Sequence, residues 1–234
     1  MPSKHNLVLV PGLLCDELLW KPQTSALADV ARCWTADHTR SDTMAEVAAD
    51  VLRDAPFDTF ALAGLSMGGY VALEIVRQAR RRVERLALLD TSARADTPDQ
   101  TRKREQFISL AERGRFMGVT DALLPLLLHP THLGDSELVI TVKKMARKTG
   151  REAFIREEHA IMSRLDSLPL LPRIACPTLV LCGRQDALTP LDRHEEIAAA
   201  IPGSRLEIIE DCGHLSTLER PIEVNSALRR WLQA

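Results

Sequence analysis

Short apolar runs alternate with amphipathic segments along most of this chain, and this alternation constrains the fold more than any other feature. The segments between the runs repeat apolar residues at helical spacing. We predict strands at 6–10, 31–37, 59–64, 85–90, 177–183 and 204–211. We predict helices near 20–30, 43–54, 67–82, 191–200 and 220–233. Strands that alternate with helices form parallel sheets covered on both faces. The sequence therefore predicts an α/β fold with a doubly wound, mostly parallel, six-stranded sheet.

The alternation is interrupted once, after the fourth predicted strand. Between 92 and 173 the strand signal disappears, and apolar residues recur at helical spacing among many charged residues. We therefore predict a helical insertion over 92–173 on a core made of 1–91 and 174–234. A chain of 234 residues with 45% hydrophobic residues is long enough to form one globular domain with such an insertion.

Composition narrows the range of partners. The formal charge of −2 gives no field of one sign that would attract nucleic acid or an anionic membrane. The five cysteines are odd in number and include no C-x-x-C pair, which fits a reducing compartment. The apolar stretch before Pro11 is too short for a secretory signal or a membrane span. We expect a cytoplasmic protein that acts on a small molecule and binds neither nucleic acid nor membrane.

One serine, Ser66, stands directly after the predicted strand 59–64 and before a predicted helix. The local sequence GLSMG fits the G-x-S-x-G motif in the strand, turn and helix context that the motif requires. Such a turn holds the serine at an unfavourable φ, so the absence of side chains at Gly64 and Gly68 relieves a steric clash. The turn would lift the hydroxyl above the sheet and leave the Met67 N–H free. Taken alone, the pattern also fits a glycine-rich turn without chemistry.

A nucleophilic serine needs a base, usually a histidine that a carboxylate orients. Of the seven histidines, His214 is the one in a loop between the last predicted strand and the last predicted helix. Loops at the carboxyl ends of strands are where α/β sheets collect functional groups. Asp186 lies in the equivalent loop after the preceding strand, and the order Ser66, Asp186, His214 is typical of this kind of site. Asp90, which ends the strand 85–90, is an alternative acid, although it also reads as a cap of backbone N–H groups.

The loop after the first predicted strand is the expected source of a second donor to an oxyanion, beside the Met67 N–H. Gly12 permits a turn there, and Pro11 has no N–H to donate. We therefore predict Leu13 and Met67 as the backbone oxyanion donors, with Leu14 as the alternative to Leu13.

The sequence gives little indication of a metal site. His129 and His132 are three residues apart, but Pro130 lies between them and no carboxylate or thiolate accompanies them in the sequence. We expect neither a metal ion nor an organic cofactor.

These motifs together resemble the α/β-hydrolase superfamily over essentially the whole chain. The stretch LVPGLLCDELLWKPQ is similar to the family's oxyanion loop and first helix, PTLVLCGRQDALTP to its acid loop, and IIEDCGHLSTLERP to its histidine loop. The resemblance implies a carboxylesterase-like serine hydrolase whose cap occupies the insertion 92–173. Two features depart from the family pattern: Pro11 replaces a histidine that many members carry, and the chain begins at what would be the third strand of the family's sheet. The second departure is why we expect a trimmed sheet.

Ser66 at the turn implies acyl transfer rather than the chemistry of those family members that carry aspartate there. The resemblance leads us to expect hydrolysis of a carboxylic ester through an acyl-enzyme. The insertion is rich in leucine and poor in aromatic residues, which favours a small or aliphatic acyl or alcohol group. Enol-lactone hydrolysis, thioester hydrolysis and peracid formation are alternatives for the same site. A non-catalytic receptor for a small ligand is a hypothesis of a different class.

Overall fold

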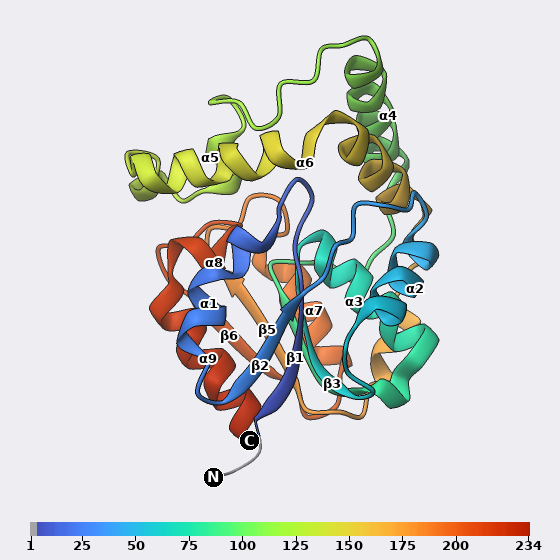
Figure 1. The fold of residues 1–234 in the computed structure, drawn as a ribbon, viewed down its shortest axis with the longest axis vertical. Helices are drawn as coiled ribbons and strands as arrows, with labels where there is room; N and C mark the ends of the chain where they lie inside the picture. The colour runs from blue at the N-terminus through green and yellow to red at the C-terminus, as the bar shows by residue number, and fades with distance from the viewer. Residues whose placement is uncertain (1–3) are drawn as a thin grey trace.

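The computed structural model describes residues 4–234 and contains a sheet of six parallel strands (Figure 1). The first three residues of the predicted segment 1–91 lie outside the described residues. The strands are β1 (His5–Val10), β2 (Ala31–Thr35), β3 (Phe60–Leu65), β4 (Val83–Leu89), β5 (Thr178–Gly183) and β6 (Arg205–Ile209). Their order across the sheet is β2-β1-β3-β4-β5-β6. The predicted α/β fold and six-stranded sheet are confirmed, and every pairing in the sheet is parallel.

Successive side chains of each strand enter different cores, because a strand turns alternate residues to opposite faces. In β1, Leu7 and Leu9 belong to one buried cluster, and Val8 and Val10 belong to another. Both faces of the sheet are therefore covered, which explains why the strands read as continuous apolar runs rather than as alternating ones.

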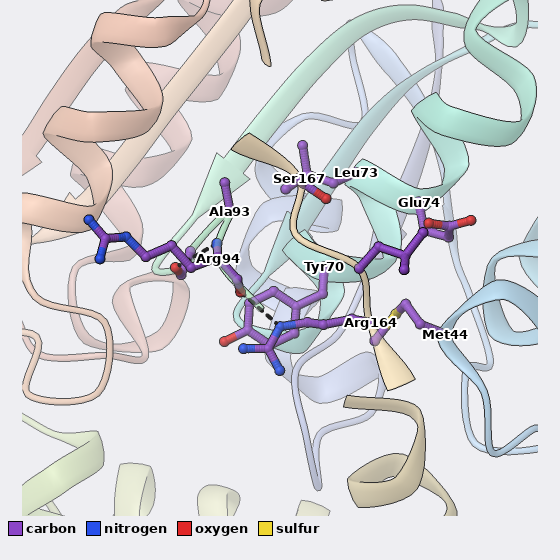
Figure 2. A pocket seen from close by; sticks show the side chains of 10 residues that line it. Met44, Tyr70, Leu73, Glu74, Ala93, Arg94, Arg164 and Ser167 are labelled. Carbon is purple, nitrogen blue, oxygen red and sulfur yellow. Dashed lines mark hydrogen bonds between the residues drawn. The ribbon is translucent and has the colours of Figure 1, made fainter. Parts of the chain in front are cut away.

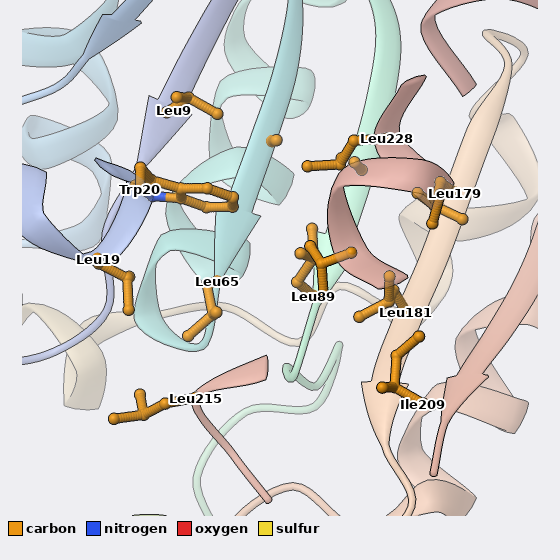
Figure 3. Close-up of a cluster of buried hydrophobic side chains, with 14 of the residues drawn as sticks. Leu9, Leu19, Trp20, Leu65, Leu89, Leu179, Leu181, Ile209, Leu215 and Leu228 are labelled. Atoms are coloured by element: carbon orange, nitrogen blue, oxygen red, sulfur yellow. The ribbon is translucent and has the colours of Figure 1, made fainter. Parts of the chain in front are cut away.

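Helices on the two faces complete these cores. One face is covered by α2 (Met44–Asp54), α3 (Met67–Ala79) and α7 (Leu191–Ala200), and the other by α1 (Lys21–Ala26) and α9 (Pro221–Gln233). Figure 3 shows the cluster on the side of α1 and α9, where Trp20 and Leu228 lie near Leu65 and Leu89 of the sheet.

The first helix is shorter than the predicted helix 20–30. A 3₁₀ turn, η1 (Glu17–Trp20), precedes α1, and the helix ends at Ala26. The amides of Val30 and Ala31 both donate to the carbonyl of Leu27, at 3.0 and 2.8 Å. This tight turn brings the chain into β2 and leaves no room for further helical residues.

Three helices lie above the carboxyl ends of the strands (Figure 1). They are α4 (Pro98–Glu112), α5 (Leu124–Leu127) and α6 (Ser136–Ser163), and they fall between β4 and β5 in the sequence. Gly150 interrupts the helical geometry of α6 with φ 77° and ψ 175°, so this helix is bent. The division of the chain at 92 and 173 stays a prediction.

Five shorter elements complete the fold: η2 (Arg80–Arg82), η3 (Pro130–His132), η4 (Leu168–Arg173), α8 (Ser216–Glu219) and η1. Among residues 4–234, no helix combines the length and the apolarity that crossing a bilayer requires.

Candidate active site

Ser66 occupies the sharp turn between β3 and α3. Its φ of 57° and ψ of −117° lie in a region that non-glycine residues rarely adopt. A Cβ atom on Gly64 would overlap the carbonyl oxygen of Gly68, and one on Gly68 would overlap the carbonyl oxygen of Val10. Because backbone atoms cannot move aside as a side chain can, both positions require glycine. Steric overlap therefore explains the glycines at positions 64 and 68, as the sequence predicted.

The structure brings the side chains of Ser66, His214 and Asp186 together. The Nε2 atom of His214 lies 2.8 Å from Ser66 Oγ, and its Nδ1 atom lies 2.8 Å from Asp186 Oδ2. His214 and Asp186 are each 3% exposed. Asp186 follows β5, His214 follows β6 and Ser66 follows β3, so all three side chains come from the carboxyl edge of the sheet.

The charges at this site favour one proton arrangement. Burial alone would lower the pKa of His214, but the Asp186 carboxylate, its hydrogen bond to the ring, and the smaller effects of Asp90 and Glu219 together raise this pKa above its ordinary value. Burial alone would raise the pKa of Asp186, but the His214 ring and the hydrogen bonds that Asp186 accepts lower it. With Asp186 ionised, the proton of a neutral imidazole lies on Nδ1. The lone pair of Nε2 then faces the Ser66 hydroxyl.

The loop after β5 fixes the Asp186 carboxylate. Its Oδ1 accepts hydrogen bonds from the Leu188 and Thr189 amides at 2.8 and 2.9 Å, and its Oδ2 accepts one from Thr189 Oγ1 at 2.7 Å. Our sequence analysis missed Thr189. An aspartate in a loop often accepts a backbone N–H two residues on, which indicates the turn at Leu188 but not the Thr189 hydroxyl.

Asp90, the alternative acid, has other partners. Its Oδ1 accepts a hydrogen bond from the Gly183 amide at 2.9 Å, and its Oδ2 accepts one from the Ser216 hydroxyl. Burial and the nearby Asp186 charge raise the pKa of Asp90. The structure brings Asp186, and not Asp90, into hydrogen-bond contact with His214.

The predicted oxyanion donors lie on the loop after β1 and at the start of α3. The amides of Leu13 and Met67 donate to no other residue within 4–234. The Leu14 amide, our alternative to Leu13, donates to Glu157 Oε2 at 3.2 Å. A Cβ atom on Gly12 would lie 3.3 Å from Ser66 Cβ, so this loop approaches the serine closely. The geometry favours Leu13 over Leu14 as the free donor.

Glu219 holds the loop that carries His214. Its Oε1 accepts hydrogen bonds from the amides of Gly213 and Leu215, at 3.0 and 3.2 Å, on both sides of the histidine. Its Oε2 accepts one from the His129 amide at 2.7 Å and lies 2.9 Å from His132 Nδ1. Glu219 was not predicted from the sequence, although a glutamate five residues after His214 is a candidate to bind the amides of that loop.

Thr91 and His194 hold the turn between β3 and α3 that carries Ser66. We call this turn the elbow. The Thr91 hydroxyl donates to the Ser66 carbonyl at 2.7 Å, and the Thr91 amide donates to His194 Nε2 at 2.8 Å. Burial lowers the pKa of His194 to about 4, so its ring is neutral and can accept this bond. No local pattern in the sequence indicated this pair.

A small cavity lies where the end of α6 meets the core (Figure 2). The Arg164 guanidinium stacks on the ring of Tyr70, 4.3 Å from its centroid, and Arg164 Nε donates to the Arg94 carbonyl at 3.1 Å. The cavity encloses about 10 Å³, room for about one water molecule. We assign it to packing between α6 and the core.

Within residues 4–234, no group of three or more His, Cys, Asp or Glu side chains is arranged to hold a metal ion. His132, one of the two histidines that the sequence raised as a metal candidate, lies beside Glu219 instead.

A family model, related sequences and solved structures all place this chain in one family. The alpha/beta hydrolase family model matches residues 7–227. A thermophilic esterase from Thermogutta terrifontis superposes with a TM-score of 0.88 at 32% identity, over 99% of this chain and 90% of the other. RutD of Yersinia enterocolitica, named for a proposed carbamate hydrolase activity, is 26% identical over 99% of this chain and 88% of its own length. The enol-lactonase of Burkholderia xenovorans has a TM-score of 0.89 at 24% identity, over 99% of this chain and 92% of the other, and shares the fold. This chain belongs to the alpha/beta hydrolase family.

Proposed function

We propose that this protein is a serine hydrolase that cleaves small carboxylic esters through an acyl-enzyme. The observation that carries the proposal is the continuous polar contact from Ser66 Oγ through the His214 ring to Asp186, with 2.8 Å at each step. The esterase from Thermogutta terrifontis, which shares 32% of its residues with this chain, supports the choice of ester.

In the proposed reaction, Ser66 Oγ bonds to the ester carbonyl carbon while its proton passes to His214 Nε2. The amides of Leu13 and Met67 donate to the oxyanion that forms. The bond to the alcohol oxygen then breaks, and His214 returns its proton to that oxygen. A water molecule then bonds to the acyl carbon while His214 takes its proton. The bond to Ser66 Oγ breaks, His214 returns the proton to Oγ, and the carboxylic acid leaves. Asp186 holds the proton on Nδ1 throughout and stabilises the imidazolium.

Fluorophosphonate labelling followed by peptide mapping tests this proposal. The adduct is expected on Ser66 and is expected to be absent from Ser66→Ala. Substitution of Ser66 or His214 by alanine is expected to lower kcat on p-nitrophenyl esters by roughly a millionfold. A folded wild-type protein that takes no label would contradict the proposal and favour the receptor hypothesis.

Carbamate hydrolysis is a second candidate, because RutD proteins from four bacteria match 97–100% of this chain at 25–28% identity. The same serine could attack a carbamate carbonyl. A matched pair of p-nitrophenyl substrates, one an acetate ester and one a carbamate, separates the two. The larger kcat/KM identifies the preferred acyl group, and a lactone and a thioester complete the panel.

A further inference from the structure

Glu157 on α6 reaches into the loop that carries the predicted oxyanion donor. Its carboxylate is fully buried, with Oε2 accepting the Leu14 N–H at 3.2 Å. Its Oε1 lies 3.0 Å from His38 Nε2 in a close polar contact that lacks the angle of a hydrogen bond. Glu157 therefore joins three segments that are far apart in sequence: α6, the loop 11–15, and the segment after β2. We call the loop 11–15 the oxyanion loop.

The oxyanion loop is held in a conformation that its residues do not favour. Leu14 has a φ of 59°, and the turn is closed by a hydrogen bond of 3.0 Å from the Cys15 amide to the Gly12 carbonyl. A leucine in this left-handed region is strained, because its Cβ crowds the following carbonyl oxygen. Because Leu14 is not glycine, some external contact must maintain this conformation, and Glu157 supplies one at the Leu14 amide.

The Leu14 amide and the Leu13 residue are mechanically linked. The Leu14 N–H belongs to the rigid peptide plane that follows Leu13. A carboxylate that fixes this plane restricts rotation about Leu13, whose own N–H is the predicted donor. An acceptor at Leu14 therefore controls the direction of the Leu13 amide without touching a substrate.

Packing on the other side of the oxyanion loop is incomplete. A cavity of about 330 Å³ is lined by Cys15 and Asp16 at the end of the loop, by residues 35–39, and by Lys148 and Thr149 of α6. Side chains do not fill this space, so van der Waals contact holds the loop from the other side, where Leu14 belongs to a buried cluster with Ala111 and Phe154. Glu157 adds a polar anchor at the Leu14 amide.

We propose that Glu157 is a positioning residue for the oxyanion hole, an inference that rests on the acyl-transfer function proposed for Ser66. Through Leu14, it holds the Leu13 amide toward the serine and makes the oxyanion hole depend on the position of α6. The His38 ring lies on the other side of the Glu157 carboxylate, with Nε2 3.0 Å from its second oxygen. Arg156 adds a second tie between α6 and this region, with its Nε donating to the Thr39 carbonyl at 2.8 Å.

Two conservative substitutions separate positioning from charge. Glu157→Gln keeps the length of the side chain and an oxygen that can accept the Leu14 N–H. Glu157→Asp keeps the negative charge near His38 but withdraws the acceptor by one methylene group. Positioning predicts a kcat within about threefold of wild type for the glutamine variant and a loss of about 10–100-fold for the aspartate variant, less than the 10²–10³ of removing an oxyanion donor outright. KM should change little in both.

Glu158 provides the matched control. It is the next residue on α6 and is equally buried, but its Oε2 accepts a hydrogen bond from Arg104 at 2.7 Å within the helices above the sheet. Arg104 retains Asp96 as a second partner at 2.7 Å. Glu158→Gln is therefore expected to lower the melting temperature without a selective loss of kcat.

Binding of a trifluoromethyl ketone supplies a readout that general destabilisation would not move. Its adduct with Ser66 carries an oxyanion, so its affinity should fall in parallel with kcat/KM, whereas the affinity for a product alcohol should not. The inference is overturned if Glu157→Asp retains wild-type kcat and ketone affinity, if the glutamine variant loses more than the aspartate variant, or if Glu158→Gln shows the same loss.

The labelling experiment keeps this inference separate from the proposed function. If wild-type Ser66 takes no fluorophosphonate, the proposed function fails. If Ser66 is labelled at the same rate in wild type and in Glu157→Asp, the proposed function stands and the positioning role of Glu157 is wrong.

Discussion

Asp186 and Asp90 are buried carboxylates near His214, and their hydrogen bonds give them different properties. Asp186 accepts bonds from Thr189 and from the imidazole, which hold its pKa below the ordinary value. Asp90 is fully buried beside that negative charge, which raises its own pKa. Two close carboxylates rarely ionise together. The pair therefore divides into an ionised acid that orients the histidine and a second acid that bonds to Ser216 and Gly183.

Substitution of Asp186 by asparagine should change both the size and the pH dependence of activity. An amide cannot stabilise the imidazolium, so kcat is expected to fall by about 10⁴. Without the carboxylate, burial is no longer outweighed and the pKa of His214 falls. Since the base must be neutral, the acid limb of the kcat/KM profile of the residual activity should move to lower pH. Rates measured between pH 4 and 8 check both effects.

Asp90→Asn is the matched control for this prediction. Asparagine tolerates the positive φ of 45° at this position and can still accept the Gly183 amide. Its kcat is expected to remain within about tenfold of wild type. A greater loss for Asp90→Asn than for Asp186→Asn would reverse the assignment of the acid.

A residue of the site could be predicted from the sequence where a side chain of the required chemistry lies in a loop directly after a predicted strand. Ser66, Asp186 and His214 each follow a strand that the sequence indicates, and the structure brings them together. Their catalytic roles stay predictions. The polar contact between His38 and α6 could not be predicted from the sequence. The partner of His38, Glu157, is 119 residues away on the bent helix α6, and no local pattern specifies where such a helix meets the core.

At the scale of elements, the turn from β3 to α3 is the most constrained connection. Gly64→Ala would drive a Cβ atom into the Gly68 carbonyl, which cannot move without displacing α3. We expect a loss of stability on the order of 3 kcal/mol, the upper end for overpacking. Gly134→Ala is the control, because nothing lies within 4 Å of its Cβ position. Urea unfolding of both variants checks the prediction, and equal stability would contradict it.

The loop that carries His214 is held by the Glu219 carboxylate at the end of α8 and by the Leu127 carbonyl. Glu219→Ala removes the acceptor of the Gly213 amide and leaves the Leu215 amide with the Leu127 carbonyl alone, so the loop around His214 should become less ordered. We expect kcat to fall by about 10–100-fold with little change in KM, since a small misplacement of a catalytic group can cost 10² in rate.

Glu219→Gln and Glu223→Ala are the comparisons for this experiment. The glutamine retains one oxygen for the two loop amides and should recover most of the activity. Glu223 is exposed on the first turn of α9, so its alanine variant should match wild type. Equal kcat for Glu219→Ala and wild type would show that the loop holds its shape without this contact.

The elements themselves differ in how far the sequence predicts them. The strands were predicted to within about two residues, because buried parallel strands give continuous apolar runs that end at turn residues. The first helix was predicted too long, since its end is decided by hydrogen bonds to Leu27 rather than by apolar spacing. The bend of α6 at Gly150 was not predicted, because a glycine inside a helical pattern indicates a break only in its tertiary setting.

At the scale of the whole molecule, the contacts of Thr91 and His194 hold the Ser66 turn and also make folding stability depend on pH. His194 is buried and neutral, and it accepts the Thr91 amide while the Thr91 hydroxyl bonds to Ser66. Its pKa in the folded protein is about 4, against an ordinary value of 6.5. Between these values the unfolded chain binds a proton that the folded protein excludes. Folding stability should therefore be complete above pH 6.5 and should fall as the pH drops toward 4.

His194→Gln removes this titration while keeping an acceptor for the Thr91 amide. One pH unit corresponds to about 1.4 kcal/mol per proton, so the wild type should lose a few kcal/mol of unfolding free energy relative to the variant between pH 6.5 and 4. Urea unfolding across this range measures the difference, with the exposed His159→Gln as the control that should follow the wild type. Parallel curves for wild type and His194→Gln would mean that His194 takes up its proton without unfolding the protein. In that case protonated His194 could no longer accept the Thr91 amide, although the protein stayed folded. As the pH is lowered, kcat would then fall at a higher pH than the free energy of unfolding.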